Sequence, residues 1–176
     1  MSGQVSRGSA GEYQADEWAG IARHMGTVGS EPYGNVTVKG DSQLTATSVP
    51  AEEVPSIIDE IPLLALLATC AKGTSCFIDV GELRVKESDR LSAIVEGLTK
   101  LGCTAYVRDD TLFVEGGTLP NGNAELAACG DHRLAMCWAL AGSLFDATVT
   151  LDDVDCISVS YPQFLRDLAW VTDAGR

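Results

Sequence analysis

The stretch Leu83-Arg84-Val85-Lys86-Glu87-Ser88-Asp89-Arg90 combines cations, carboxylates and a helix-capping pair in one short turn. The apolar residues that follow it have the spacing of one helical face: Leu91, Ile94, Val95, Leu98 and Leu101. Ser88 or Asp89 can cap this helix. A helix N-terminus has free N–H groups and a positive dipole end, so the turn suits an anion. An ordinary capped surface helix with ion pairs explains these residues equally well.

Glu87 has a lysine on one side and an arginine three residues later. Neighbouring cations can hold such a carboxylate ionised or poise it for proton transfer. Lys86 and Arg90 also add charge and hydrogen-bond donors at the start of the helix. The turn is therefore a candidate for both anion binding and acid–base chemistry.

Two further helix starts resemble each other. Ile58-Asp59-Glu60-Ile61-Pro62 precedes an apolar run to residue 68, and Gly130-Asp131-His132-Arg133 precedes another to residue 141. Both runs are apolar nearly all round, which predicts buried helices. The aspartate in each start is at a natural cap position, and a structural cap is commoner there than a catalyst. Arg133, beside a buried helix, requires an anionic partner.

An internal repeat links two parts of the chain. Trp18–Gly26 followed by Asn35–Gly40 matches Ile94–Gly102 followed by Thr111–Gly116, with fourteen residues from glycine to glycine (26 to 40, and 102 to 116). Each copy predicts a helix, a glycine stop, a strand, a turn and a strand. An apolar helix follows each copy, and a strand follows each helix, at 75–80 and 147–151. This alternation indicates an α/β or α+β layer fold.

Bulk properties narrow the class of protein. With 176 residues and 45% apolar content, the chain is long enough for one domain with a core; we expect a disordered lead-in over residues 1–12 and a single domain over 13–176. A net charge of −13 argues against nucleic acid as a partner. No segment has the pattern of a signal peptide or a membrane span. Six cysteines without metal-ligand spacing indicate a reducing, cytoplasmic setting and no metal site.

The three helix starts together, in this order and spacing, resemble the EPSP synthase family, the 3-phosphoshikimate 1-carboxyvinyltransferases. The resemblance runs from about Tyr13 to Trp170 and covers the C-terminal portion of such an enzyme. It implies repeated βαβαββ units around buried parallel helices, and an active site in the cleft between two domains. Parallel helices would bring the helix starts to one exposed face, forming a platform from these residues: Asp59, Lys86, Glu87, Arg90, His132 and Arg133.

The resemblance also implies a reaction and its residues. The enolpyruvyl group of phosphoenolpyruvate would be transferred to the 5-hydroxyl of shikimate 3-phosphate, with release of phosphate and without a metal or organic cofactor. Asp59 and Glu87 match the family's acid–base carboxylates, and Asp59 also contacts the shikimate hydroxyls. Lys86 matches the lysine that bridges the two substrates. Arg90 and Arg133 match arginines that bind phosphoenolpyruvate, and His132 stands beside them.

Two positions depart from the family's pattern. Val159 stands three residues before Pro162, where many members carry a lysine near the phosphate of phosphoenolpyruvate. Glu82 falls where some members place an asparagine, and the pattern assigns it no role. The motifs of the family's N-terminal portion have no equivalent here, so the missing half of the enzyme is an expected partner and the isolated chain is expected to be inactive.

Two alternatives remain open at this point. The chain could belong to a related enolpyruvyl transferase, for example one that acts on a nucleotide sugar. It could also be a non-catalytic or partner-dependent fragment that binds an anionic ligand or its missing half.

Overall fold

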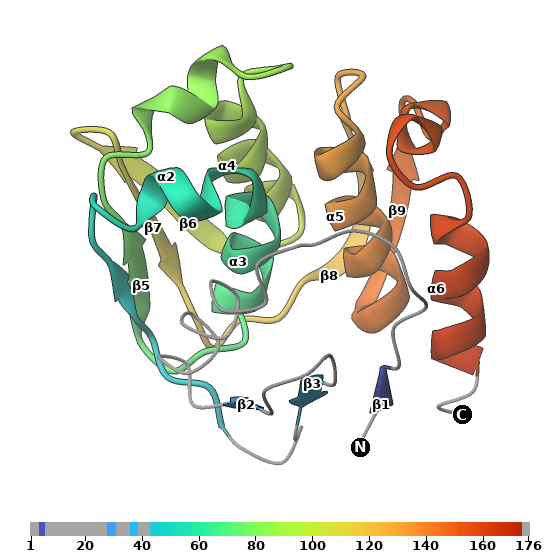
Figure 1. Cartoon of the computed structure of the whole chain (residues 1–176), viewed down its shortest axis with the longest axis horizontal. Helices are drawn as coiled ribbons and strands as arrows, with labels where there is room; N and C mark the ends of the chain where they lie inside the picture. Colours follow the sequence, from blue (N-terminus) through green and yellow to red (C-terminus); the bar gives the residue numbers. More distant parts are fainter. Residues whose placement is uncertain (1–3, 6–27, 31–35, 39–42, 174–176) are drawn as a thin grey trace.

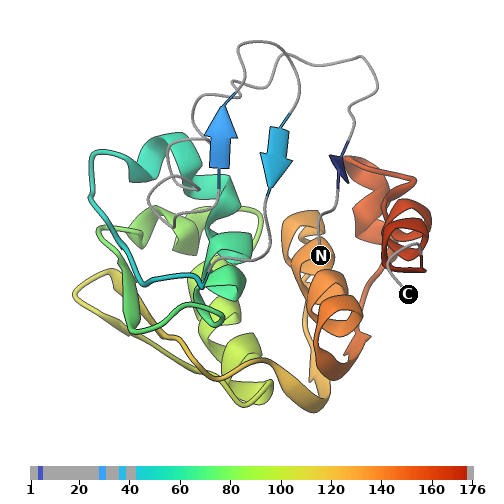
Figure 2. The ribbon, with the colours of Figure 1, turned by 90° about the horizontal axis from the view of Figure 1, so that it is seen from below.

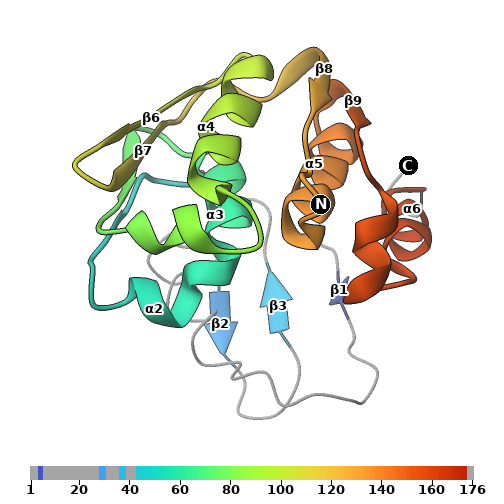
Figure 3. The ribbon, with the colours of Figure 1, turned by 90° about the horizontal axis from the view of Figure 1, so that it is seen from above.

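The structure, a computed structural model, describes residues 4–5, 28–30, 36–38 and 43–173. Three helices, α3 (Ile61–Ala68), α4 (Arg90–Lys100) and α5 (His132–Leu144), lie side by side in the middle of the molecule. A four-stranded sheet lies on one side of them and a two-stranded sheet on the other (Figures 1, 2 and 3). The expected mixed fold of repeated units around buried helices is confirmed.

The four-stranded sheet belongs to one complete βαβαββ unit. Its strands are β4 (Ser48–Val49), β5 (Thr74–Phe77), β6 (Thr104–Arg108) and β7 (Thr111–Glu115), in the order β4-β5-β7-β6. Strands β4 and β5 are parallel, and β7 is antiparallel to both of its neighbours. The short helix α2 (Val54–Ile57) and α3 connect the first two strands, and α4 connects the second to the third.

A second unit follows with parallel strands. Strand β8 (Asn121–Leu126) pairs in parallel along its whole length with β9 (Asp146–Leu151), and α5 connects them. Helix α6 (Phe164–Asp173) comes after a 3-10 turn at Asp155–Val159 and packs on α5 (Figure 1). Strand, helix, strand and helix repeat the order of the first unit.

The internal repeat is visible in two antiparallel hairpins. Strand β2 (Val28–Ser30) starts two residues after Gly26, as β6 starts two residues after Gly102, and β2 pairs with β3 (Val36–Val38) as β6 pairs with β7. The helix expected at 18–26 lies outside the described residues. So does most of the expected lead-in over 1–12, where Gln4–Val5 forms strand β1 on the edge of β3. The extent of a single domain over 13–176 stays a prediction.

The parallel arrangement of α4 and α5 rests on two contacts. Arg90 bonds to Asp131 at the helix starts, and Gly97 lies against the ring of Trp138 seven residues further along each helix. A β-carbon at Gly97 would collide with that ring. Two pairs at equal spacing mean that the helices run side by side in the same direction. Helix α3 joins the bundle, with the Cys137 thiol donating to the carbonyl oxygen of Pro62 at 3.3 Å.

One expected cap is wrong. Asp59 does not cap the helix that follows it, because it lies in a 3-10 turn at Ile58–Glu60, and α3 begins after Glu60 without any side-chain cap. Pro62 in the first turn has no N–H, so one of the donors that a cap would satisfy is missing. Asp89 and Asp131 do cap their helices, as expected.

None of the described helices combines the length and the apolar character that crossing a bilayer requires.

Candidate functional site

A single buried arginine holds the three helix starts together. Arg90 is 0% exposed. Its Nε donates to Oδ2 of Asp131 at 2.6 Å, Nη1 to Oδ1 of Asp59 at 2.7 Å, and Nη2 to Oε2 of Glu87 at 2.5 Å. These partners belong to the starts of α5, α3 and α4 respectively. The guanidinium therefore ties together three segments that are distant in sequence, and its burial is compensated by charged acceptors on every nitrogen.

Asp131 has two functions in this arrangement. Its Oδ1 accepts from the backbone N–H of Arg133 at 2.9 Å and caps α5, while Oδ2 accepts from Arg90 and from the hydroxyl of Ser88 at 3.2 Å. Burial raises the pKa of this carboxyl, but the hydrogen bonds and charge of Arg90 outweigh burial and lower it below its ordinary value. Asp131 is thus a fixed anion beneath the site.

Arg133 approaches a different carboxylate oxygen of Asp59 than Arg90 does. Its Nη1 donates to Oε1 of Glu60 at 2.9 Å and to the backbone oxygen of Asp59 at 3.2 Å, and its Nη2 is 3.8 Å from Oδ2 of Asp59. The anionic partner expected for Arg133 is therefore present. Unlike Arg90, Arg133 is partly exposed to solvent.

Lys86 completes the cationic group. Its Nζ lies 2.8 Å from Oε1 of Glu82 and 3.9 Å from Oδ1 of Asp59. The hydrogen bond with Glu82 raises the pKa of Lys86, so the ammonium is charged at neutral pH. Lys86 follows directly after the 3-10 turn at Gly81–Val85, which places it opposite the start of α3.

Asp59 is the residue that all three cations share. Burial raises its pKa, but the hydrogen bond from Arg90 and the charges of Arg133, Arg90 and Lys86 together lower the pKa below its ordinary value. Asp59 is consequently ionised at neutral pH, and its side chain is about half exposed. The neighbouring cations thus hold Asp59 in its charged form.

The structure thus brings together five of the six residues predicted for the platform: Asp59, Lys86, Glu87, Arg90 and Arg133. The expectation of one exposed face is wrong for Arg90, because three carboxylates enclose it. His132 is the first residue of α5 and is half-buried, but its side chain has no hydrogen bond to the described part of the chain. Val159 is 78% exposed and ends the 3-10 turn at Asp155–Val159, and its aliphatic side chain offers no charge to a ligand.

Sequence reasoning missed four members of the cluster: Ser88, Asp131, Glu60 and Glu82. The sequence predicts Asp131 only as a cap and assigns no role to Glu82. One signal was available for Asp131, since an arginine at the start of a buried helix requires acceptors for its whole guanidinium. Nothing in the sequence separates Glu60 and Glu82 from the other glutamates of the chain.

Charge decides what the cluster can bind. Five carboxylates surround three cations: Asp59, Glu60, Glu82, Glu87 and Asp131 around Lys86, Arg90 and Arg133. An anionic ligand must therefore replace carboxylates as the partner of these cations. Of the three carboxylates on Arg90, Glu87 and Asp59 are best placed to give way, because both are about half exposed whereas Asp131 is buried. Once displaced, they are proton acceptors or donors beside a bound anion.

Comparison with known proteins finds relatives that match most of the chain. A sequence profile of EPSP synthase (3-phosphoshikimate 1-carboxyvinyltransferase) matches residues 12–168. The 3-phosphoshikimate 1-carboxyvinyltransferase of Roseiflexus sp. (strain RS-1) is 45% identical over 145 residues, which are 82% of this chain and 33% of that protein. The protein of the same name from Oceanobacillus iheyensis is 43% identical over 142 residues, 80% of this chain and 32% of that protein.

Solved structures show the same similarity. An EPSP synthase from Acinetobacter baumannii superposes with a TM-score of 0.76 at 29% identity, over 87% of this chain and 38% of that one. The enolpyruvyl transferase NikO from Streptomyces tendae shares the fold, with a TM-score of 0.72 at 22% identity, over 89% of this chain and 35% of that one. The chain spans about a third of the length of the curated relatives that it matches.

Proposed function

Because the chain belongs to the EPSP synthase family, we propose that it supplies one wall of a carboxyvinyltransferase active site. The reaction transfers the enolpyruvyl group of phosphoenolpyruvate to the 5-hydroxyl of shikimate 3-phosphate and releases phosphate. The observation that carries this proposal is the convergence of the three helix starts on Arg90, with acid–base carboxylates and partly exposed cations in contact. The reaction joins two anionic substrates and moves protons, and it needs both kinds of group.

The hydrogen bonds of Arg90 suggest how phosphoenolpyruvate is accommodated. In the structure Nη1 and Nη2 bond to Asp59 and Glu87, whereas Nε bonds to the fully buried Asp131. We propose that the anion replaces the two exposed carboxylates, and that Asp131 keeps the guanidinium in place. A planar fork of N–H donors suits a carboxylate or phosphate. Arg133 and Lys86 approach the same anion from their exposed sides.

The displaced carboxylates then have a chemical role. Asp59, freed from Arg90, accepts the proton of the attacking hydroxyl. Glu87 lies next to the anion that has replaced it and exchanges a proton with the methylene carbon of phosphoenolpyruvate. His132, one residue from Arg133, is proposed to contact the substrate at the rim. These roles are assigned from proximity and from the family's reaction.

Turnover is proposed to require the remainder of a family protein. The chain spans about a third of its relatives, and a platform on one side cannot hold two substrates in attack geometry. Such positioning contributes on the order of 7–11 kcal/mol to rate. A second candidate function follows from the same fact: by itself, the chain binds an anion or the remainder of such a protein without turnover.

The free state of all six cysteines supports a cytoplasmic setting.

The test is phosphate release in the presence of both substrates. We expect the 176-residue chain alone to show none, and a chimera in which the Roseiflexus relative supplies the other segments to turn over at roughly 1 s⁻¹ or faster. A folded chimera without activity would contradict the carboxyvinyltransferase proposal. Turnover by the chain alone would contradict only the proposal that turnover requires the remainder of a family protein.

A further inference from the structure

One pairing of strands occurs twice within the chain, and a third copy of the pattern is incomplete. Strand β5 is followed by α4 and the hairpin β6–β7, and it pairs antiparallel with β7, which gives the order β5-β7-β6. Strands β1, β2 and β3 have the equivalent order β1-β3-β2, with β1 antiparallel to β3. Strand β9 is likewise followed by a helix, α6, but no hairpin comes after it among the described residues.

Strand β9 has an open edge at the place where β7 pairs with β5 in the first unit. Strand β8 pairs in parallel with one edge of β9, as β4 pairs with one edge of β5. The other edge of β9 has no strand partner in the part of the chain that the structure describes (Figure 1). Open edges are usually protected by proline or lysine, and β9, from Asp146 to Leu151, contains neither. The edge is therefore suited to pairing with a further strand.

Helix α6 lacks cover on the same side of the unit. In α4, Leu91, Ile94 and Leu98 form one face, are 0% exposed and belong to the core that includes β7. The apolar face of α6 has the same helical spacing, but none of its residues is buried and Leu165 is 46% exposed. Its residues are Leu165, Leu168, Ala169 and Thr172.

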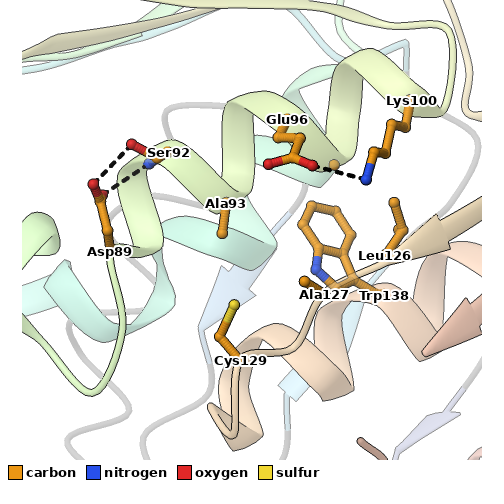
Figure 4. A pocket seen from close by; sticks show the side chains of 10 residues that line it. Asp89, Ser92, Ala93, Glu96, Lys100, Leu126, Ala127, Cys129 and Trp138 are labelled. Carbon is orange, nitrogen blue, oxygen red and sulfur yellow. Dashed lines mark hydrogen bonds and ion pairs between the residues drawn. The ribbon is translucent and has the colours of Figure 1, made fainter. Parts of the chain in front are cut away.

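Helix α4 has neighbours on two sides, and α6 has one on a single side. One side of α4 lies against its own sheet, and another faces Leu126 and Trp138 of the second unit across a small pocket (Figure 4). Helix α6 packs on α5, with Phe164 against buried residues of the second unit. The exposed face of α6 thus corresponds to the face of α4 that its own sheet covers.

The sequence after α6 continues the repeat as far as a glycine. Gly102 stands two residues after the end of α4 and two residues before β6. Gly175 stands two residues after the end of α6 in the sequence. A strand with the spacing of β6 would begin just beyond Arg176. The hairpin that would complete this copy is therefore outside these 176 residues.

We propose that the open edge of β9 and the exposed face of α6 bind an antiparallel β-hairpin from a segment outside these 176 residues. One strand of the hairpin pairs with β9 as β7 pairs with β5, and its inward apolar side chains cover Leu165 and Ala169. The chain spans about a third of its curated relatives, so most of such a protein is available to supply the hairpin. A second copy of the chain is a poorer occupant, because each copy carries a net charge of −13.

Residue-resolved hydrogen exchange tests the proposal on the 176-residue chain and on the chimera with the Roseiflexus relative. Successive N–H groups of a strand point to opposite edges, so Val149 reports on one edge of β9, and Thr148 and Thr150 report on the other. In the chain alone, the set that faces β8 should be protected and the other set should exchange freely. In the chimera the second set should also be protected, by roughly tenfold or more. An inactive chimera with both sets protected would contradict the proposed function and support the hairpin.

Two substitutions on α6 form a matched pair. Leu165→Glu places a charge on the face that the hairpin covers, and Trp170→Glu places one on a different side of the same helix, where the side chain is 73% exposed. Both should leave the melting temperature of the chain alone nearly unchanged. In the chimera only Leu165→Glu should lower the melting temperature, because the charge is then buried.

Free exchange of the second set of amides in the chimera would overturn the proposal, and so would equal effects of the two substitutions there. Protection of that set in the chain alone, together with elution as a dimer in size-exclusion chromatography, would show that a second copy occupies the edge. Cross-strand contacts between Hα protons in NMR spectra identify an antiparallel partner of β9, and contacts typical of a parallel partner would also overturn the proposal.

Discussion

The guanidinium of Arg90 and the carboxylate of Asp131 meet at 2.6 Å, and neither side chain is exposed to solvent. Breaking a buried ion pair by removing one partner leaves an uncompensated charge and typically costs about 3–5 kcal/mol. The pair therefore supports the helix bundle as well as the site above it.

Asp131→Asn should destabilise the fold by about 3–5 kcal/mol. Asparagine is also a good helix cap, so the cap of α5 is retained and only the charge opposite Arg90 is lost. Asp89→Ala is the matched control, because it removes an exposed cap of α4 and should cost about 1 kcal/mol. Urea unfolding monitored by circular dichroism measures both, and equal effects would contradict the special role of the buried pair.

Glu87→Gln should lower turnover of the chimera by roughly 10²- to 10⁴-fold, as loss of a general acid–base group does. The Glu87 side chain is 55% exposed, so the melting temperature of the variant chimera should differ little from that of the parent. Glu96→Gln is the control, since Glu96 is an exposed glutamate of the same region that pairs only with Lys100. Near-normal turnover of Glu87→Gln would show that Glu87 is merely a partner of Arg90.

Arg133→Ala should weaken the binding of phosphoenolpyruvate more than it lowers the maximal rate, because it removes a charge-assisted contact to the ligand. Steady-state kinetics of the chimera separate the two effects. Arg84→Ala is a suitable control, because Arg84 is an exposed arginine whose ion pairs with Asp89 and Asp110 lie outside the cluster. Loss of thermal stability without loss of affinity would favour a purely structural role for Arg133.

Gly97→Ala should destabilise the chain by roughly 1–3 kcal/mol, the usual cost of overpacking a core. Alanine normally stabilises a helix relative to glycine, so a loss here isolates the collision with Trp138. Gly142→Ala in α5 is the control, because the added β-carbon would lie 3.3 Å from Cβ of Val149, which is a tight contact but not a collision. Combining Gly97→Ala with Trp138→Leu should restore part of the loss.

Acid should weaken the fold through Asp59 and Asp131. Both carboxyls have a pKa below the ordinary 3.8, because the hydrogen bonds and charge of Arg90 outweigh the opposing effect of burial. The unfolded chain then binds protons at higher pH than the folded chain does. The stability that the two carboxylates contribute is complete above about pH 5 and is lost as the pH falls through the folded pKa values. As the pH falls below about 5, the urea midpoint of unfolding should decline less steeply for the Asp131→Asn variant than for the parent chain.

Local sequence signals were sufficient for α3, α4 and α5 and for the hairpins of the repeat, whereas α2 and α6 were not predicted. The apolar periodicity after Arg90 and the caps at Asp89 and Asp131 place α4 and α5 correctly, since both signals act within a few residues. The cap expected at Asp59 failed because Pro62 altered the first turn of α3. Strand β5 ends at Phe77 and not at residue 80 as predicted. The chain turns at Asp79, which has a φ of +59°.

The composition of the site was predictable only in part. The resemblance to a family identified the residues, but not that carboxylates enclose Arg90 or that Glu60 and Glu82 pair with the other cations. Those facts depend on distances between segments that are far apart in sequence. A single sequence carries no local signal for which of several exposed glutamates meets a given lysine.

The three bonds of Arg90 also bear on the order of folding. Two of them close loops of 31 and 41 residues, whereas the bond to Glu87 spans only three. Closing long loops is entropically costly, so such contacts form after local helices. We expect the transition state to contain α4 with its own cap and little of the Arg90 cluster. Substitutions at Asp131 should then accelerate unfolding and leave the folding rate nearly unchanged. Binding competence would thus arise in the last step of folding, and a partly folded chain would present no anion site.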